Sequence, residues 1–167
     1  GRTYYVQVGA FSSGDAKFVY TMKATYTAVA DAFEPNDSFD TATPIGLGTS
    51  YSGYYFTGYI NAAAPTVERL YDIYAVPLNA GNVKINLTDL PAEFTAAVRV
   101  FDPTRTQTGD YGYNSAPGGA LTYEFTAATA GTYYLRVEDF GSAPFAGNAT
   151  ALPEHFIKPY QLMVTQP

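Results

Sequence analysis

Short runs in which apolar and polar residues alternate recur along most of the chain. In residues 82–87, Val83, Ile85 and Leu87 fall on one side and Lys84 and Asn86 on the other, as in a strand with one buried face. Comparable runs cover residues 51–60, 71–78, 96–102, 121–127, 132–137 and 160–165. Turn-forming sequences rich in Gly, Pro, Asn and Asp separate these runs, and none has the apolar spacing of an amphipathic helix. The pattern predicts an all-β protein built as an antiparallel β-sandwich.

Two segments far apart in the chain have similar sequences. Residues 3–13 read TYYVQVGAFSS and residues 132–142 read TYYLRVEDFGS, with Thr, Tyr, Tyr, Val, Phe and Ser at matching positions. Chance similarity between Tyr-rich strands could produce this match. We favour a tandem repeat, in which residues 1–30 are the closing hairpin of a preceding repeat plus a linker, and residues 31–167 are a complete sandwich domain.

Such a hairpin would carry unpaired backbone groups at its edges. We expect it to pack against neighbouring repeats of the same protein, or to pair with the same hairpin of a second copy and form a homo-oligomer.

Residues 31–42, DAFEPNDSFDTA, concentrate oxygen-bearing side chains in one short stretch. Calcium takes about six to eight oxygen ligands from carboxylates, amides, backbone carbonyls and water, so the stretch is a candidate calcium loop. The residues alone also allow two simpler roles. Asn36, Asp37 or Ser38 could cap a helix, or the acidic residues could belong to a solvated linker.

Several segments together resemble the bacterial pre-peptidase C-terminal domain, to which the collagen-binding domains of clostridial collagenases are similar. The segments are EPND (34–37), YDIYAVPLNAGNVKINL (71–87), GTYYLRV (131–137) and YQLMV (160–164). The resemblance covers residues 31–167. It implies a calcium-binding, jelly-roll-type β-sandwich that is appended to secreted peptidases and other exported bacterial proteins.

The resemblance also implies which oxygens would bind Ca²⁺. The candidate ligands are Asp31, Glu34, Asn36, Asp37, Glu68 and Asp72. Asp31 would replace an acidic residue at the position of Ala32, and Glu68 would replace one at the position of Arg69. These departures favour one calcium site over two. The ion would fasten the linker to the sandwich and set the orientation of consecutive domains.

Composition excludes several other classes of function. The chain has 9 basic and 15 acidic residues and a net charge of −6, so it lacks the basic surface that nucleic-acid binding requires. No apolar run is long enough to insert into a membrane. Cysteine is absent and His155 is the single histidine, which leaves no thiol nucleophile, Ser-His-Asp triad or zinc site. The sequence leaves open a glycosidase-type carboxylate pair among Glu124, Glu138 and Asp139, but nothing in it marks these residues as buried or matched. The resemblance implies a secreted or cell-surface protein, and the missing catalytic groups lead us to expect that it is not an enzyme.

Tyrosine is the most informative residue type that remains, with 16 tyrosines and no tryptophan. A tyrosine offers a flat apolar ring and a hydrogen-bonding tip, which suits sugars and extended proteins. The candidates for a ligand-binding surface are Tyr51, Tyr55, Tyr111 and Tyr113, with core packing as the alternative for any strand tyrosine. Two functions follow. One is a non-catalytic, calcium-stabilised accessory or linker module, and the other is a module that targets an attached enzyme to polysaccharide or to a collagen-like extracellular protein.

Overall fold

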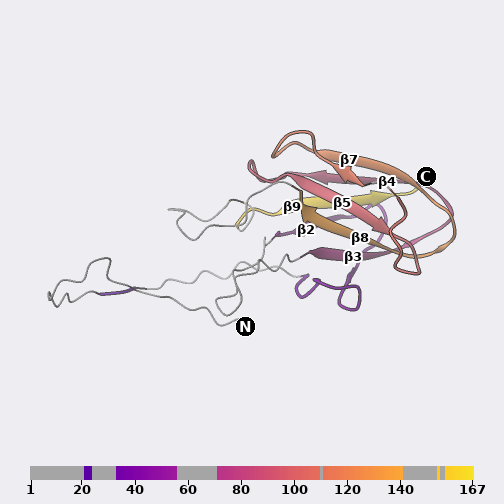
Figure 1. The fold of residues 1–167 in the computed structure, drawn as a ribbon, viewed down its shortest axis with the longest axis horizontal. Coiled ribbons are helices and arrows are strands. Elements are labelled where there is room, and N and C mark those ends of the chain that lie inside the picture. The colour runs from indigo at the N-terminus through magenta and orange to yellow at the C-terminus, as the bar shows by residue number, and fades with distance from the viewer. Residues whose placement is uncertain (1–20, 24–32, 56–70, 110, 141–153, 155–156) are drawn as a thin grey trace.

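The computed structural model describes residues 21–23, 33–55, 71–109, 111–140, 154 and 157–167 (Figure 1). The hairpin expected within residues 1–30 falls outside this part except for residues 21–23, and so do the candidate ligands Asp31 and Glu68. The repeat, the oligomer and the roles of these two acidic residues therefore stay predictions.

The described strands form two sheets. The five-stranded sheet has the order β1 (Thr43–Pro44), β3 (Asp72–Leu78), β8 (Gly131–Asp139), β5 (Ala96–Phe101) and β6 (Gly112–Tyr113). The four-stranded sheet has the order β2 (Ser50–Gly53), β9 (Tyr160–Thr165), β4 (Gly81–Thr88) and β7 (Leu121–Ala127). Every pair is antiparallel except β1 with β3. The predicted all-β sandwich is confirmed (Figure 1).

The core lies between the sheets and follows the predicted alternation. In β4, Val83, Ile85 and Leu87 are at most 1 % exposed, whereas Lys84 faces solvent. Strand β8 contributes Tyr133, Leu135 and Val137 from the opposite sheet, and these side chains are also buried. Because each sheet buries one face of alternating residues, its other face is left to vary.

Three strands differ from the sequence prediction. Strand β2 covers Ser50–Gly53, the start of the run predicted over 51–60, and residues 56–60 lie outside the described part. Strands β1 and β6 were not predicted, because each contains two residues. A two-residue strand is too short to show an alternating pattern, and its pairing is determined by the neighbouring strand.

Candidate functional site

The EPND loop lies against the beginning of β3. Asn36 is 1 % exposed, and its backbone oxygen accepts a hydrogen bond of 2.8 Å from the amide of Ile73. Just before the loop, the backbone oxygen of Phe33 accepts a hydrogen bond of 3.0 Å from the Thr43 hydroxyl. The ring of Phe33 meets Tyr74 edge-on, with 6.2 Å between the ring centroids. The loop is therefore part of the folded sandwich, which a solvated linker would not be.

Side-chain oxygens of this loop are buried. Oδ1 of Asn36 is inaccessible to solvent and accepts no hydrogen bond from the described residues, which is costly for a buried amide oxygen unless a donor or a cation lies beside it. Oε2 of Glu34 and Oδ1 of Asp37 are buried as well. A set of carboxylate and amide oxygens is the donor chemistry that Ca²⁺ prefers, so the residues present fit calcium.

Among the described residues, carboxylates alone do not make up a metal site, because no three Asp, Glu, His or Cys side chains of this part gather as a metal-binding group. From the described residues, a calcium ion would draw on the Asn36 amide oxygen, backbone carbonyls and water in addition to carboxylates.

Asp72 occupies the first position of β3 and is 3 % exposed. Its Oδ2 accepts a short hydrogen bond from the hydroxyl of Tyr160 on β9. The hydroxyls of Tyr160 and Tyr74 lie 2.7 Å apart. Because Tyr160 donates its proton to Asp72, Tyr74 donates to Tyr160. Burial, and then the charge of Asp72, raise the pKa of Tyr160 well above its ordinary value, which keeps this hydroxyl protonated as a donor.

These contacts connect the loop to both sheets. The amide that follows Asp72 holds the Asn36 backbone, and the Asp72 carboxylate holds Tyr160 of the four-stranded sheet. The structure thus brings the predicted ligands Asn36 and Asp72 into one region. Their binding of a metal stays a prediction, as does that of Glu34 and Asp37.

The expectation that Tyr55 is exposed is wrong. Tyr55 is 2 % exposed and its ring stacks on Phe94, with 4.8 Å between centroids. Burial raises the pKa of its hydroxyl. Tyr51 is half-buried, and its hydroxyl accepts a hydrogen bond of 2.8 Å from the Gly46 amide. Gly53, between these two tyrosines, leaves the space that the hydroxyls of Tyr74 and Tyr160 occupy. A Cβ at Gly53 would lie 2.7 Å from the Tyr160 hydroxyl oxygen.

Tyr113 is exposed, and Tyr111 is half-buried beside it. Tyr113 is 54 % exposed and stacks on Phe140, which is 43 % exposed, with 5.3 Å between centroids. Tyr111 contacts both rings at 5.2 to 6.0 Å. Sequence reasoning missed Phe140. The available signal was its position two residues beyond Glu138, on the outward side of the strand.

A charged group that the sequence did not reveal borders these rings. The carboxylate of Glu138 forms ion pairs with Arg99 on β5 and with Arg136 on its own strand, the latter at 2.9 Å. The Arg99 guanidinium lies 4.1 Å above the centroid of the Tyr111 ring, and that of Arg136 lies 4.3 Å above the centroid of Tyr71. Glu138, one of the acidic residues considered for a glycosidase pair, is therefore an ion-pair partner that positions two arginine side chains.

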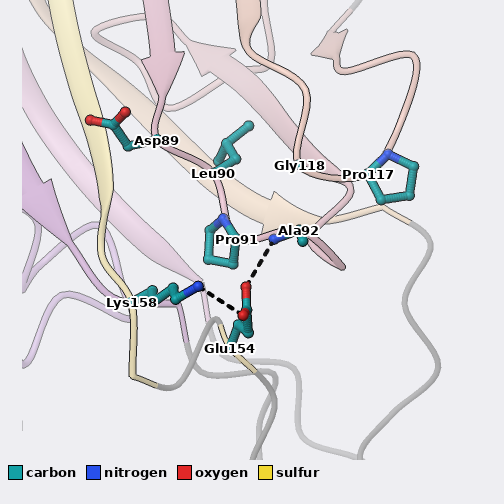
Figure 2. A pocket seen from close by; sticks show the side chains of 8 residues that line it. All are labelled: Asp89, Leu90, Pro91, Ala92, Pro117, Gly118, Glu154 and Lys158. Carbon is teal, nitrogen blue, oxygen red and sulfur yellow. Dashed lines mark hydrogen bonds and ion pairs between the residues drawn. The ribbon is translucent and has the colours of Figure 1, made fainter.

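A surface hollow of about 530 Å³ is lined by residues that lie between β4 and β5, between β6 and β7, and before β9. Figure 2 shows the Glu154 carboxylate between the Lys158 ammonium, at 2.7 Å, and the Ala92 amide, at 3.4 Å. The hydrogen bond from Lys158 is the main cause that lowers the pKa of Glu154. The remaining lining residues are Asp89, Leu90, Pro91, Pro117 and Gly118 (Figure 2). Nothing among the lining residues forms a nucleophile with an adjacent base.

Three solved structures are similar to this chain. The pre-peptidase C-terminal domain of a collagenase from Bacillus anthracis is 18 % identical, and the match covers 74 % of this chain and 94 % of that one with a TM-score of 0.47. CorA, a surface-associated copper-binding protein of Methylomicrobium album BG8, is 12 % identical, with 75 % and 98 % of the two chains covered and a TM-score of 0.48. PliG, a periplasmic inhibitor of g-type lysozyme from Aeromonas hydrophila, is 16 % identical, with 74 % and 96 % covered and a TM-score of 0.39.

No curated protein sequence matches the chain. Across the described part of the chain, no helix is long and apolar enough to cross a membrane. The family model of the bacterial pre-peptidase C-terminal domain matches residues 71–139, from the residue before β3 to the end of β8. This match confirms, over residues 71–139, the resemblance to the bacterial pre-peptidase C-terminal domain that was found in the sequence.

Proposed function

We propose that this chain is a non-catalytic accessory module of a secreted or surface-displayed bacterial protein, and that a calcium ion bound by the EPND loop stabilises it. The pre-peptidase C-terminal domain is an accessory β-sandwich of bacterial proteins. In this role the module supports or positions the domains attached to it, and neighbouring repeats of the same protein are its expected partners.

One observation carries the calcium proposal. The Oδ1 atom of Asn36 is buried without a hydrogen-bond donor among the described residues, in a loop that also buries a carboxylate oxygen of Glu34 and one of Asp37. A protein retains such an atom at a cost to the free energy of folding unless something outside the chain compensates for it. Calcium, a hard cation with an oxygen-only preference, is the ion that these groups suit.

The proposed ion would supply positive charge that offsets repulsion among the loop carboxylates. The chain's own residues then transmit the effect. Asn36 is hydrogen-bonded to Ile73, Asp72 accepts from Tyr160, and Tyr160 belongs to β9. Fastening the loop therefore fixes the segment before the sandwich against a strand that is linked to both sheets. Calcium affinities of extracellular modules, with Kd of about 10⁻⁴–10⁻³ M, suit such a joint outside the cell.

Thermal unfolding in CaCl₂ and in EDTA tests the proposal. At a calcium concentration of about 100 Kd, binding to the folded state adds roughly 2.7 kcal/mol to the free energy of unfolding, which corresponds to several degrees in Tm. We expect Asn36→Ala and Asp37→Ala to remove this difference in Tm. Mg²⁺ at the same concentration should not replace calcium, because it requires a smaller, octahedral site.

Asp40→Asn is the matched control. Asp40 lies in the same loop, but its carboxylate is exposed and pairs with Arg105 at 2.7 Å, so this variant should retain the full calcium shift. Equal Tm values in CaCl₂ and EDTA would overturn the calcium proposal. If Asp40→Asn removed the calcium-dependent Tm shift as completely as Asp37→Ala, the calcium site would not be the EPND residues.

A second candidate function is the targeting of an attached enzyme to a polymer. The observation that favours it is the exposure of Tyr113, whose ring contacts Phe140 and Tyr111 on the surface. Tyr51 and Tyr55 do not contribute to such a surface, because the core holds them. Polysaccharide and collagen-like protein are the two polymer classes to be distinguished.

A further inference from the structure

Three aromatic rings form a platform on the outer face of the five-stranded sheet. The aromatic platform consists of Tyr111, Tyr113 and Phe140, whose ring centroids are 5.2 to 6.0 Å apart. The other large apolar side chains that are exposed among the described residues are Met22, Leu47 and Ile157. Rings that gather in water without reaching the core are typical of an interaction site.

The strands hold the platform in place. Tyr113 lies opposite Ala97 of β5, while its neighbour Gly112 faces the core, where a Cβ would come within 2.6 Å of the Cβ of Tyr123. Phe140 lies one residue beyond β8, and its amide donates a hydrogen bond of 2.7 Å to the Thr95 backbone oxygen. The exposure of both rings therefore follows from strand alternation rather than from a loop conformation.

Positive charge borders the platform. Arg99 stacks on the ring of Tyr111, lies opposite Arg136 in the β5–β8 register, and shares with it the carboxylate of Glu138. Two guanidinium groups and one carboxylate leave one positive charge here, in a chain whose net charge is −6. The ion pair with Glu138 also limits how far Arg99 can move, so its remaining N–H groups are held beside the ring of Tyr111.

We propose that the aromatic platform and Arg99 bind an acidic polysaccharide, one whose sugar rings carry carboxylates. The apolar face of a sugar ring packs on the exposed rings of Tyr113 and Phe140. A ring carboxylate accepts hydrogen bonds from the guanidinium beside them. The inference rests on the second candidate function, polymer targeting, and does not depend on the calcium joint.

An extended peptide fits these features less well. Such a peptide binds most readily along an unpaired strand edge. Strand β6 is the edge strand of its sheet and pairs with β5 on one side, but the platform rings stand on the face of the sheet and not along that edge.

Isothermal titration calorimetry with short oligosaccharides tests the assignment. The whole chain, dialysed against excess CaCl₂, is titrated with trigalacturonate, with neutral maltotriose and with soluble gelatin, and each ligand is also titrated into the calcium buffer as a blank. We expect trigalacturonate to bind, and to bind at least about tenfold more tightly than maltotriose. Tyr113→Ala and Phe140→Ala should each weaken trigalacturonate binding by about tenfold. Raising the NaCl concentration should weaken it further, because Arg99 contributes charge.

Ile157→Ala is the control, since it removes an apolar side chain that is 51 % exposed and outside the platform. Binding that Ile157→Ala weakens as much as Tyr113→Ala would overturn the proposal. So would binding of maltotriose or gelatin in preference to trigalacturonate, although polymer targeting would then stand. If none of the three ligands binds, both the proposal and the targeting function fail, and the calcium melts remain unaffected by that result.

Discussion

The outer faces of the two sheets differ in chemistry, although the same alternation produces both. On the four-stranded sheet, β4 and β7 present matched polar pairs across the strands: Asn82 with Thr126 at 3.0 Å, Lys84 with Glu124 at 3.3 Å and Asn86 with Thr122 at 3.0 Å. On the five-stranded sheet, β5 and β8 present Arg99, Arg136 and Glu138 between aromatic rings.

The difference shows which surface the fold requires and which it does not. The polar pairs on β4 and β7 satisfy one another, as ordinary cross-strand partners do, and they leave a flat surface that water can cover. The arginines and rings on the other face are large and costly to order, and the core between the sheets does not need them. We therefore propose the outer face of the five-stranded sheet as the binding face, and the following predictions compare the two faces.

The largest difference in stability between the two outer faces should come from the two ion pairs. The Glu138 side chain is 9 % exposed and holds two arginines, whereas Lys84 and Glu124 are 47 % and 69 % exposed. Glu138→Gln leaves two neighbouring guanidinium groups without their anion and should lower the free energy of unfolding by about 2–3 kcal/mol, less than for a fully buried pair. Glu124→Gln should cost less than about 1 kcal/mol. Urea denaturation of both variants measures the two values.

Salt provides a second measurement of the same contrast. Unfolding in about 1 M NaCl should reduce the small contribution of Lys84 and Glu124 and leave most of that from Glu138, because solvent ions screen an exposed pair more strongly. Equal losses for the two variants would show that the two faces are energetically alike, against our interpretation.

An intermediate effect is expected where a ring and a cation stack. Tyr111→Leu removes the contact with Arg99, in which the guanidinium lies 4.1 Å from the ring centroid, and should cost about 0.5–1 kcal/mol. Phe101→Leu tests a longer contact on the same face, since Arg136 lies 5.3 Å from that ring, but Phe101 is also packed and only 9 % exposed. Tyr111 is therefore the cleaner probe. Tyr111→Phe, measured by the same denaturation, should retain most of the stability; a loss equal to that of Tyr111→Leu would exclude the stacked cation as the cause.

Sequence patterns predicted the long strands because the information is local there. In β4 the order of Val83, Lys84, Ile85 and Asn86 already separates the two faces, so the local sequence is enough to predict which side chains are buried. Strand β6, by contrast, exists because Gly112 and Tyr113 reach the edge of β5, a long-range pairing that two residues cannot encode.

The candidate sites were predictable to a similar extent. The oxygen-rich composition of EPND predicted the loop, and the structure adds that Asn36 is buried and tied to Ile73. The direction of Tyr55 could not be predicted, since a glycine between two tyrosines also suits an exposed strip of rings. Only the three-dimensional packing shows that Gly53 leaves room for Tyr160. The Arg99–Glu138 pair joins positions that are distant in sequence, and no local pattern connects them.

The smallest effect on stability should occur at the centre of the aromatic platform. Tyr113 is 54 % exposed and contacts two rings that are themselves at the surface, so Tyr113→Ala should lower the free energy of unfolding by less than about 1 kcal/mol. Buried Tyr133, 1 % exposed on the next strand but one, is the comparison: Tyr133→Ala should cost about 3–5 kcal/mol through the cavity it leaves. If Tyr113→Ala lowered the free energy of unfolding as much as Tyr133→Ala, the Tyr113 ring would be needed for the stability of the fold. The aromatic platform would then be a packed part of the structure and not a separate binding surface.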